Sequence, residues 1–413
     1  MMKKILVVGA GIGQLYLAKK IKDRGDFLIT VTLPGNQPVI DIADKVCYED
    51  VFNKEGVLQI AKRERIDAVI SDQNDMMMPT VSFVAEHMGL PGNSTTVINA
   101  YCNKNTFRNN CDLLGIPGPR HASTWTNEVP SNIRSIPFPW VVKPADAQSS
   151  VGVAKVENLN EYYSSIQKAL GFSKTHSAIV EEFFAGQELV AEGFIYKGHY
   201  YNLGFADRHY FNLHNLFIPS QTLFPSRLPD SILRDITECE RKMAEFINPE
   251  FAIVHSEYLY NPISGEYKVV ESALRGGGVF ISSHLIPLYT GIDINDVLLD
   301  CAYGKSVDVD YILSSSFRRS AGYLCFYLPE GRVVSMSGNE KCAQFPFVKM
   351  MDVNGISIGM NSSTLTHKGQ RLGPIILDAD NREELDLRIK AIQNSFIVEV
   401  KNKDGLIRGI SWS

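Results

Sequence analysis

The sequence lacks the patterns that mark disulfide-rich, zinc-binding and membrane-spanning proteins. Its seven cysteines are scattered and form no Cys-x-x-Cys pair, which disfavours both a disulfide framework and a zinc ribbon. No stretch reaches the roughly 18 apolar residues that a membrane span requires. We therefore expect a cytoplasmic protein with no membrane partner.

An excess of basic charge is also missing. The chain has 41 Lys and Arg against 46 Asp and Glu, a net charge of −5, and no basic block. This balance argues against a dedicated nucleic-acid surface. With 413 residues, of which 45% are hydrophobic and 21% charged, the chain fits a globular protein of two or three domains, at roughly 150 residues per domain.

The first 95 residues alternate between predicted strands and helices. Apolar runs at residues 5–8, 27–33 and 67–71 are predicted to be strands. Helical periodicity predicts helices at residues 14–22 and 57–63, between these strands, and at residues 77–88, after the last one. This βαβ order predicts a mostly parallel, right-handed α/β sheet. Asp72, Gln73 and Asp75 follow the third strand, where such sheets bind ligands. Helix capping is the alternative role for these three residues.

Glycines at positions 9, 11 and 13 follow the first strand and invite a dinucleotide-binding interpretation. That interpretation also requires an acid at the end of the second strand, to hold ribose hydroxyls. Residues 27–33 offer no carboxylate. A tight turn, or a substrate-lining loop, therefore explains the glycines better than a bound NAD or FAD.

The middle third is predicted to be strand-rich. Strands are expected at residues 140–143, 151–156, 178–183, 188–196, 200–205, 251–260 and 267–271, with helices at 105–114, 159–170, 231–247 and 281–303. A third unit from about residue 306 carries short strands and a late helix, 382–394. The whole chain is thus predicted to combine α/β and α+β units.

Two acids, Glu257 and Glu271, lie within consecutive apolar strands. Burying a lone carboxylate costs several kcal/mol unless it is paired or binds a metal. Neighbouring strands can bring two such acids together, which suits Mg²⁺ held by carboxylate and phosphate oxygens, with Mn²⁺ as another hard cation. Surface-facing acids on an edge strand are the alternative.

Other residues of the middle third could bind an anion. Lys143 ends a strand and precedes a small polar loop, 144–153, whose amides and hydroxyls can close over phosphates. Arg275 is followed by three glycines, 276–278, and side-chain-free backbone suits close approach to an anion. Each signal is weak alone, and a lysine that extends its amino group to solvent is the alternative for Lys143.

Taken in order along the chain, these motifs resemble the ATP-grasp superfamily, and the resemblance covers nearly the whole sequence. Within that superfamily they are most similar to the branch near the carbamoyl phosphate synthase large chain and the amino-acid ligases. The segments that carry the resemblance are Asn103-Lys104, Phe138-Pro-Trp-Val-Val-Lys143-Pro, Ser149-Ser150-Val-Gly152, Val-Glu181-Glu182-Phe-Phe184-Ala-Gly-Gln-Glu188, Glu257 and Glu271-x-x-x-Arg275-x-Gly-Gly.

The resemblance implies three domains and a role for each matched residue. The domains would be a pre-ATP-grasp unit (1–100), an ATP-grasp domain (101–305, with a mobile lid at about 118–185) and a C-terminal domain (306–413). Lys104, Lys143 and the loop residues Ser149, Ser150 and Gly152 would contact ATP phosphates, while Glu181, Glu182, Phe184 and Glu188 would face the adenine and ribose. Glu257 and Glu271 would hold Mg²⁺, and Arg275, Gly276 and Gly277 would meet the substrate, with Arg275 steadying the transferring phosphoryl group. Apart from the resemblance, His209 follows a predicted strand at the expected mouth of the substrate pocket and is a candidate substrate residue. An ordinary loop histidine is the alternative.

The activity implied by the resemblance is ATP-dependent ligation of a small carboxylic acid, such as an amino acid, to an amine through an acyl phosphate. Two departures stand out: Ala273 replaces a common Asn ligand, and the phosphate loop has one glycine, Gly152. A biotin carboxylase-like enzyme and a nucleotide-binding regulator are the alternatives. In carboxylase relatives an acid and a His come after the Arg of this motif, whereas in this chain Gly276-Gly-Gly-Val-Phe280 comes after Arg275. Relatives are often dimers, so a homodimer is a further expectation.

Overall fold

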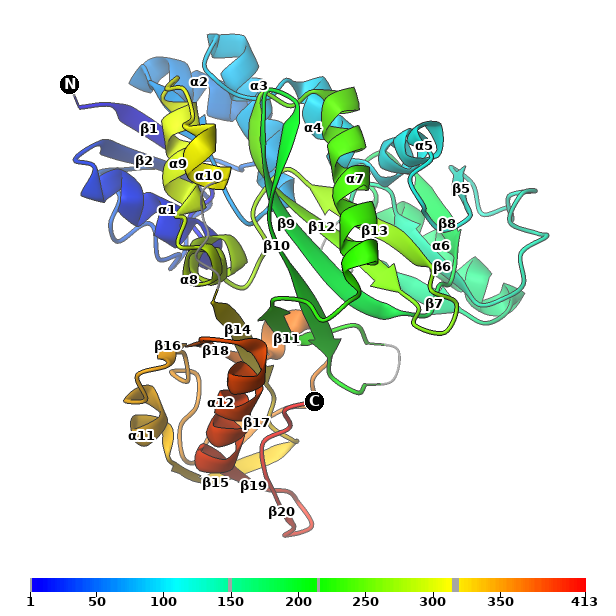
Figure 1. The fold of residues 1–413 in the computed structure, drawn as a ribbon, viewed down its shortest axis with the longest axis vertical. Helices are drawn as coiled ribbons and strands as arrows, with labels where there is room; N and C mark the ends of the chain where they lie inside the picture. The colour runs from blue at the N-terminus through cyan, green and yellow to red at the C-terminus, as the bar shows by residue number, and fades with distance from the viewer. Residues whose placement is uncertain (1, 148–150, 214–215, 314–318) are drawn as a thin grey trace.

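The computed structural model describes residues 2–147, 151–213, 216–313 and 319–413. The N-terminal part is a four-stranded parallel sheet in the order β3-β2-β1-β4, as the sequence predicts. Its elements are β1 (Lys4–Val8), α1 (Ile12–Asp23), β2 (Phe27–Thr32), β3 (Lys45–Tyr48), α2 (Lys54–Glu64), β4 (Ala68–Ile70), the short η1 (Asp75–Met77) and α3 (Met78–Met88). In Figure 1 this unit is blue and lies at the upper left.

Two helices, α4 (Thr95–Cys102) and α5 (Lys104–Leu114), lead out of the N-terminal sheet. Asn103 separates them, and its side chain accepts hydrogen bonds from the first turn of α5. Gly115 ends α5 with a left-handed φ of 65°, a conformation that favours glycine. Capping at both ends therefore fixes Lys104 as the first residue of α5.

A separate antiparallel sheet follows, in the order β5-β8-β6-β7. Its elements are β5 (His121–Thr124), β6 (Trp140–Pro144), β7 (Ala154–Val156), α6 (Leu159–Phe172) and β8 (Ala178–Glu182). Strand β7 begins three residues later than predicted, because residues 151–152 form a turn. Trp140, Tyr162 and Ile166 pack α6 onto this sheet, giving it a hydrophobic core of its own. Figure 1 places this sheet on the right, away from the N-terminal unit.

The largest sheet has eight strands in the order β13-β12-β9-β10-β11-β14-β18-β16, of which β18 (Leu372–Ala379) and β16 (Val348–Met351) belong to the C-terminal part of the chain. Its elements and those beside it are β9 (Gln187–Tyr196), β10 (His199–Tyr210), β11 (Pro219–Phe224), α7 (Asp230–Ile247), β12 (Phe251–Tyr260), β13 (Tyr267–Ala273), η2 (Ile281–Leu285), α8 (Ile286–Thr290), α9 (Ile294–Ala302), α10 (Val309–Leu313) and β14 (Ser320–Phe326). The strand predicted to end at residue 205 continues to Tyr210. This extension places Arg208 and His209 within a strand rather than in a loop.

The C-terminal residues both extend the eight-stranded sheet and form a smaller one, ordered β17-β15-β19-β20. Their elements are β15 (Gly331–Ser337), α11 (Asn339–Ala343), β16 (Val348–Met351), β17 (Asn361–Ser362), η3 (Lys368–Gln370), β18 (Leu372–Ala379), α12 (Arg382–Ser395), β19 (Ile397–Lys401) and β20 (Ile407–Arg408). Because β14 pairs with β11, the large sheet runs across the predicted boundary at residue 306. The domain division therefore stays a prediction.

Among the described residues, none of the helices combines the length and the apolar character that crossing a membrane requires.

Candidate functional site

Glu257 and Glu271 lie directly opposite each other on the neighbouring antiparallel strands β12 and β13. Opposite residues of such a pair have Cβ atoms about 4.5–5.5 Å apart, so the predicted convergence of the two carboxylates is present. Glu257 is ion-paired with Arg208 and lies 3.3 Å from His255 Nε2. In the described part of the chain, the carboxylate of Glu271 has no hydrogen-bond or ion-pair partner, and Glu271 is one of the residues that line a pocket.

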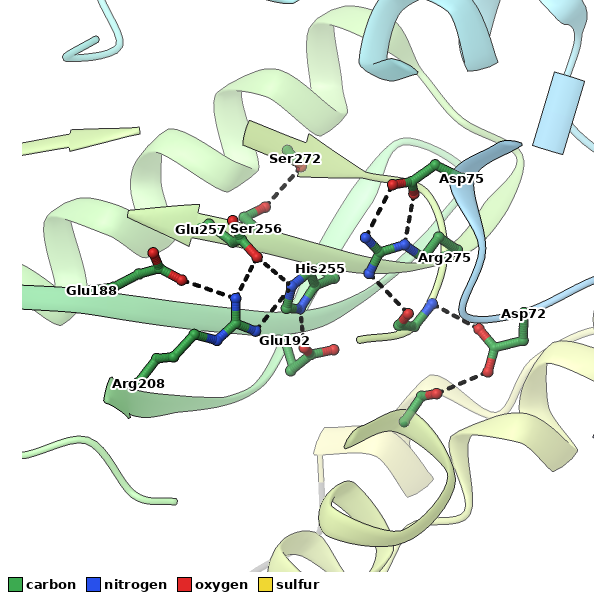
Figure 2. A network of polar contacts seen from close by, with 12 residues as sticks. Asp72, Asp75, Glu188, Glu192, Arg208, His255, Ser256, Glu257, Ser272 and Arg275 are labelled. Atoms are coloured by element: carbon green, nitrogen blue, oxygen red, sulfur yellow. Dashed lines mark hydrogen bonds and ion pairs between the residues drawn. The ribbon is translucent and has the colours of Figure 1, made fainter. Parts of the chain in front are cut away.

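Arg208 is the centre of a buried network that the sequence interpretation missed. Its Nη1 lies 2.9 Å from Glu188 Oε1 and also contacts Glu257, and its Nη2 lies 3.4 Å from His255 Nε2 (Figure 2). Burial and the nearby Glu257 charge raise the pKa of Glu188 to about 7. Burial opposes ionisation of Glu257 as well, but Arg208 and His255 hold its pKa well below the usual value. One arginine therefore serves two carboxylates of different acidity.

Glu192 extends this network on the Nδ1 side of the His255 ring. It is fully buried, and its Oε1 contacts His255 Nδ1 while its Oε2 has no partner among the described residues. Glu188 and Glu192 are four residues apart on β9, and residues at that spacing share one face of a strand. That spacing was the signal in the sequence that could have identified Glu192. Arg208 and His255 had no comparable local signal.

Arg275 connects the large sheet to the N-terminal unit. Its Nε and Nη2 bind Asp75 Oδ1 and Oδ2 at 2.6 and 3.1 Å. Asp72 accepts hydrogen bonds from Gly276 N at 2.7 Å and Ser282 Oγ at 2.8 Å, and burial raises the pKa of Asp72. The capping role belongs to Asn74, whose side chain accepts from Met76 N. Asp72 and Asp75 thus hold the segment that carries Arg275.

The glycines after Arg275 are required by internal packing. A side chain at Gly276 would overlap Ser282 and lie 2.8 Å from Asp72 Oδ1, and one at Gly277 would overlap Glu192 and lie 2.9 Å from His255 Nδ1. This close packing explains the glycines without any ligand. The substrate-binding role that the resemblance gives to Gly276 and Gly277 stays a prediction.

Lys143 and Glu181 are buried together in the four-stranded sheet that contains β6 and β8. Lys143 Nζ lies 2.6 Å from Glu181 Oε2, and Arg108 Nε of α5 lies 2.7 Å from Glu181 Oε1. Burial alone would raise the pKa of Glu181, but Arg108 and Lys143 lower it to about 2. Glu181 therefore fixes the lysine that the resemblance assigns to ATP, and the nucleotide-binding role of Glu181 itself stays a prediction.

Replacing Glu181 by Gln is expected to destabilise the protein by about 3–5 kcal/mol near neutral pH, because two buried cations lose their counter-charge. The pKa of Glu181 is lowered from 4.5 to about 2, so its stabilising effect is present above about pH 4.5 and is lost as the pH falls toward 2. The difference in the free energy of unfolding between wild type and variant should become smaller as the pH falls over that range. Urea unfolding at pH 7, 5 and 3 measures it, with the exposed Glu157→Gln as control. A constant difference would contradict this account.

The other residues that the resemblance assigns to ATP lie around the same sheet. Lys104 Nζ donates to Ala147 O at 2.6 Å, at the start of the predicted phosphate loop. Glu182 pairs with Arg120 and Lys268, and the Lys268 amino group lies 5.0 Å from the centre of the Phe184 ring. Gly152 has a left-handed φ of 71°. Ser149 and Ser150 lie outside the described residues, and their role stays a prediction.

The structure does not bring His209 to this cluster. His209 neighbours Arg208 on β10, so its side chain points to the opposite face of the strand. It is exposed there, and the charged groups near it are Asp207, Arg382 and Asp386. The substrate role predicted for His209 assumed a loop, and the longer strand β10 removes that assumption.

A pocket of about 290 Å³ opens between the N-terminal unit, α4, α5 and the end of β13. It contains Glu271 and Lys104, together with Asp75, Asp146 and Ala147. One predicted metal-binding residue, Glu271, and one predicted phosphate-binding residue, Lys104, therefore share this pocket, whereas Glu257 is not part of its lining. Lys143 is absent from its lining, because that side chain is turned to Glu181.

The carboxylates present fit Mg²⁺ that is shared with a nucleotide. Glu257 and Glu271 supply hard oxygen donors from adjacent strands, and Glu271 is unpaired in the described part of the chain. No group of three or more His, Cys, Asp or Glu that could hold a metal occurs among the described residues. Mg²⁺ is usually bound by one or two protein carboxylates, with phosphates and water completing its octahedron. A dedicated all-protein metal cage is thus not what these residues form.

Known proteins resemble this chain in sequence. Residues 119–194 match the model of the D-ala D-ala ligase C-terminus. The carbamoyl phosphate synthase large chain of Campylobacter jejuni is 24% identical over 206 residues, which cover 45% of this chain and 19% of that protein. A Wolbachia D-alanine--D-alanine ligase is 26% identical over 241 residues, covering 50% and 64%. The chain thus spans less than two thirds of these relatives.

Solved structures resemble the fold along its whole length. The L-amino acid ligase of Bacillus licheniformis superposes with a TM-score of 0.79 at 18% identity, covering 97% of this chain and 99% of that one. A biotin carboxylase domain of Hydrogenobacter thermophilus, crystallised with MgADP and bicarbonate, gives 0.73 at 15%, covering 100% and 92%. The resemblance to the ATP-grasp superfamily is confirmed at the level of the fold.

Proposed function

We propose that this chain, with its ATP-grasp fold, is an ATP- and Mg²⁺-dependent ligase that joins a carboxylate to an amine and releases ADP and phosphate. The observation that carries the proposal is the placement of Glu257 opposite Glu271, with Arg275 two residues beyond the end of β13 and Lys104 in the pocket that Glu271 also lines. Two adjacent carboxylates with basic side chains near them are suited to positioning a triphosphate and neutralising its charge.

In this proposal each side chain has a separate task. Lys104 and Lys143 bind phosphate oxygens, and Arg275, held by Asp75, steadies the phosphoryl group as it passes to the substrate carboxylate. Bound Mg²⁺ would neutralise phosphate charge between Glu257 and Glu271. Arg208 and His255 keep Glu257 ionised and oriented. The sheet of β5 to β8 would exclude water, because an acyl phosphate hydrolyses.

The alternative enzyme is a biotin-dependent carboxylase, which the carboxylase-like fold supports. Against it stands the segment after Arg275, since residues 276–280 offer neither an acid nor a histidine. Two of its glycines are also packed against Ser282 and Glu192, which leaves no room there for longer side chains. The ligase is therefore the better-supported reaction.

The decisive experiment is a matrix of carboxylic acids and amines with ATP and Mg²⁺, with ADP formation as the readout. ADP that appears only when both an acid and an amine are present supports the ligase. Turnover that depends on bicarbonate and biotin would replace it by the carboxylase, and nucleotide binding without turnover would replace it by a regulator.

Three further expectations are separate from the reaction. Activity with Mn²⁺ in place of Mg²⁺ tests the second metal, and a sedimentation measurement tests the expected homodimer. We also propose a cytoplasmic location.

Replacing Lys143 by Ala is expected to raise the KM for ATP by about tenfold, because a charge-assisted contact with phosphate is lost. Initial rates at increasing ATP concentration measure the effect. The matched control is Lys168→Ala on α6, an exposed lysine of the same sheet unit. If the Lys143 variant keeps the KM and the rate of the wild type, its assignment to ATP is wrong.

A further inference from the structure

The pocket next to Glu271 has walls from two separate parts of the chain. Phe52 and Lys54, at the start of α2, form one side, and Lys174, just after α6, belongs to the other. The Lys174 amino group lies 3.8 Å from the centre of the Phe52 ring, within the range of a cation–π contact. The pocket is therefore complete only when these two parts meet.

The depth of the pocket follows from the exposure of its residues. Lys174 is exposed and Lys54 half-buried, so both lie at the rim. Tyr101 and Ala273 are buried at 3% and 5% exposure, and they form the floor near Glu271. The Tyr101 hydroxyl has no hydrogen-bond partner among the described residues. An unpaired buried hydroxyl costs free energy, and a ligand in the pocket would offer it a partner.

Among the described residues, some of the charged side chains that line the pocket have partners, and others do not. Its acids are Glu271, assigned above to Mg²⁺, Asp75, which binds Arg275, and Asp146, which accepts the backbone amides of Lys174 and Thr175. Lys104 donates to Ala147 O. Lys54 and Lys174 have no carboxylate partner in the described part of the chain. The rim thus offers two ammonium groups to an anion.

We propose that this pocket binds the amine substrate, and that this amine carries a carboxylate, as an amino acid does. The carboxylate would lie between Lys54 and Lys174, and the amino group would point down toward Glu271 and the phosphoryl end of the site. A volume of about 290 Å³ is at the lower end of the range for small-molecule pockets and suits an amino acid. This inference rests on the proposed ligase function and adds the class of its second substrate.

The reaction balances with this placement. The amine nitrogen attacks the carbonyl carbon of the acyl phosphate, and a C–N bond forms as the C–O bond to phosphate breaks. The phosphate leaves with the electron pair, and the nitrogen gives up one proton to solvent or phosphate. No oxidant or further co-reactant is required.

Two steps separate this inference from the ligase function itself. Wild-type protein is first given ATP, Mg²⁺, a panel of carboxylic acids and hydroxylamine, which traps an acyl phosphate as a hydroxamate. The acid that reacts is then tested with matched amines, namely amino acids and their carboxamides, which are of similar size but lack the negative charge. We expect the free amino acids to have a KM at least tenfold lower than their amides.

Substitutions of the two rim lysines test whether they bind the carboxylate of the amine substrate. Lys54→Met and Lys174→Met should each raise the KM for the amino acid by about tenfold, but should hardly change the KM for its amide. Lys62→Met on the same helix as Lys54 is the control, because Lys62 is exposed and lies outside the pocket. Lys54→Arg should restore most of the affinity.

The outcomes distinguish the two proposals. If no acid gives a hydroxamate, the ligase function fails and this inference fails with it. If hydroxamate forms but amino acids and amides react with equal KM, only the amine assignment is overturned. Equal losses for amino acid and amide in the Lys54 variant would also overturn it, because the lysine would then serve the structure and not the carboxylate.

Discussion

Replacing Glu271 by Gln is expected to lower the rate of ADP formation by roughly 100-fold or more, because loss of a single preorganised electrostatic group in an active site has effects of this size. Glutamine keeps the size of the side chain but removes the negative charge that a metal requires. Glu271 has no ion pair among the described residues, so the fold should not depend on its charge. Steady-state rates at saturating ATP, over a range of Mg²⁺ concentrations, are the measurement.

Two further observations make this prediction specific to the metal. The variant should require a higher Mg²⁺ concentration for half-maximal rate, and its urea unfolding midpoint without Mg²⁺ should equal that of the wild type. Glu266→Gln, in the exposed turn between β12 and β13, is the matched control and should keep full activity. If Glu271→Gln turned over as fast as the wild type, the assignment of Mg²⁺ to this carboxylate would be wrong.

The convergence of Glu257 and Glu271 could be predicted from the sequence because two local facts sufficed. Each acid interrupts an apolar strand, and the two strands are joined by the short, turn-rich segment 261–266, which makes them antiparallel neighbours. The parallel N-terminal sheet was predictable for a similar reason, since alternating strand and helix periods admit few arrangements. Local pattern and short connections determine both features.

The partners of Glu257 could not be predicted in this way. Along the chain, Arg208 is 20 residues from Glu188, 47 from His255 and 49 from Glu257, and these residues come from three different strands. The polar run that contains Arg208 resembles a loop, and its strand conformation depends on pairing with β9 and β11. Long-range pairs of charges that satisfy each other leave no periodic signal in a single sequence. The same holds for the pocket, whose walls are more than 100 residues apart.

The buried network around Arg208 leads to the largest expected effect on stability. Arg208 lies between Glu188 and Glu257, and its side chain is only 7% exposed. Arg208→Met would remove the ion-pair partner of buried Glu188 and, among the described residues, leave Glu257 with His255 alone, which costs about 3–5 kcal/mol. Urea unfolding of the metal-free protein measures this loss.

The chain provides a matched comparison for that substitution. Arg241 on α7 also lies between two glutamates, Glu238 and Glu245, but its side chain is 46% exposed. Exposed pairs contribute about 0–1 kcal/mol, so Arg241→Met should have a small effect. Adding Glu188→Gln and Glu257→Gln to Arg208→Met removes the unpaired charges, and it should restore part of the lost stability. Equal effects of Arg208→Met and Arg241→Met would show that water reaches the network and that burial does not govern the charge of Glu257.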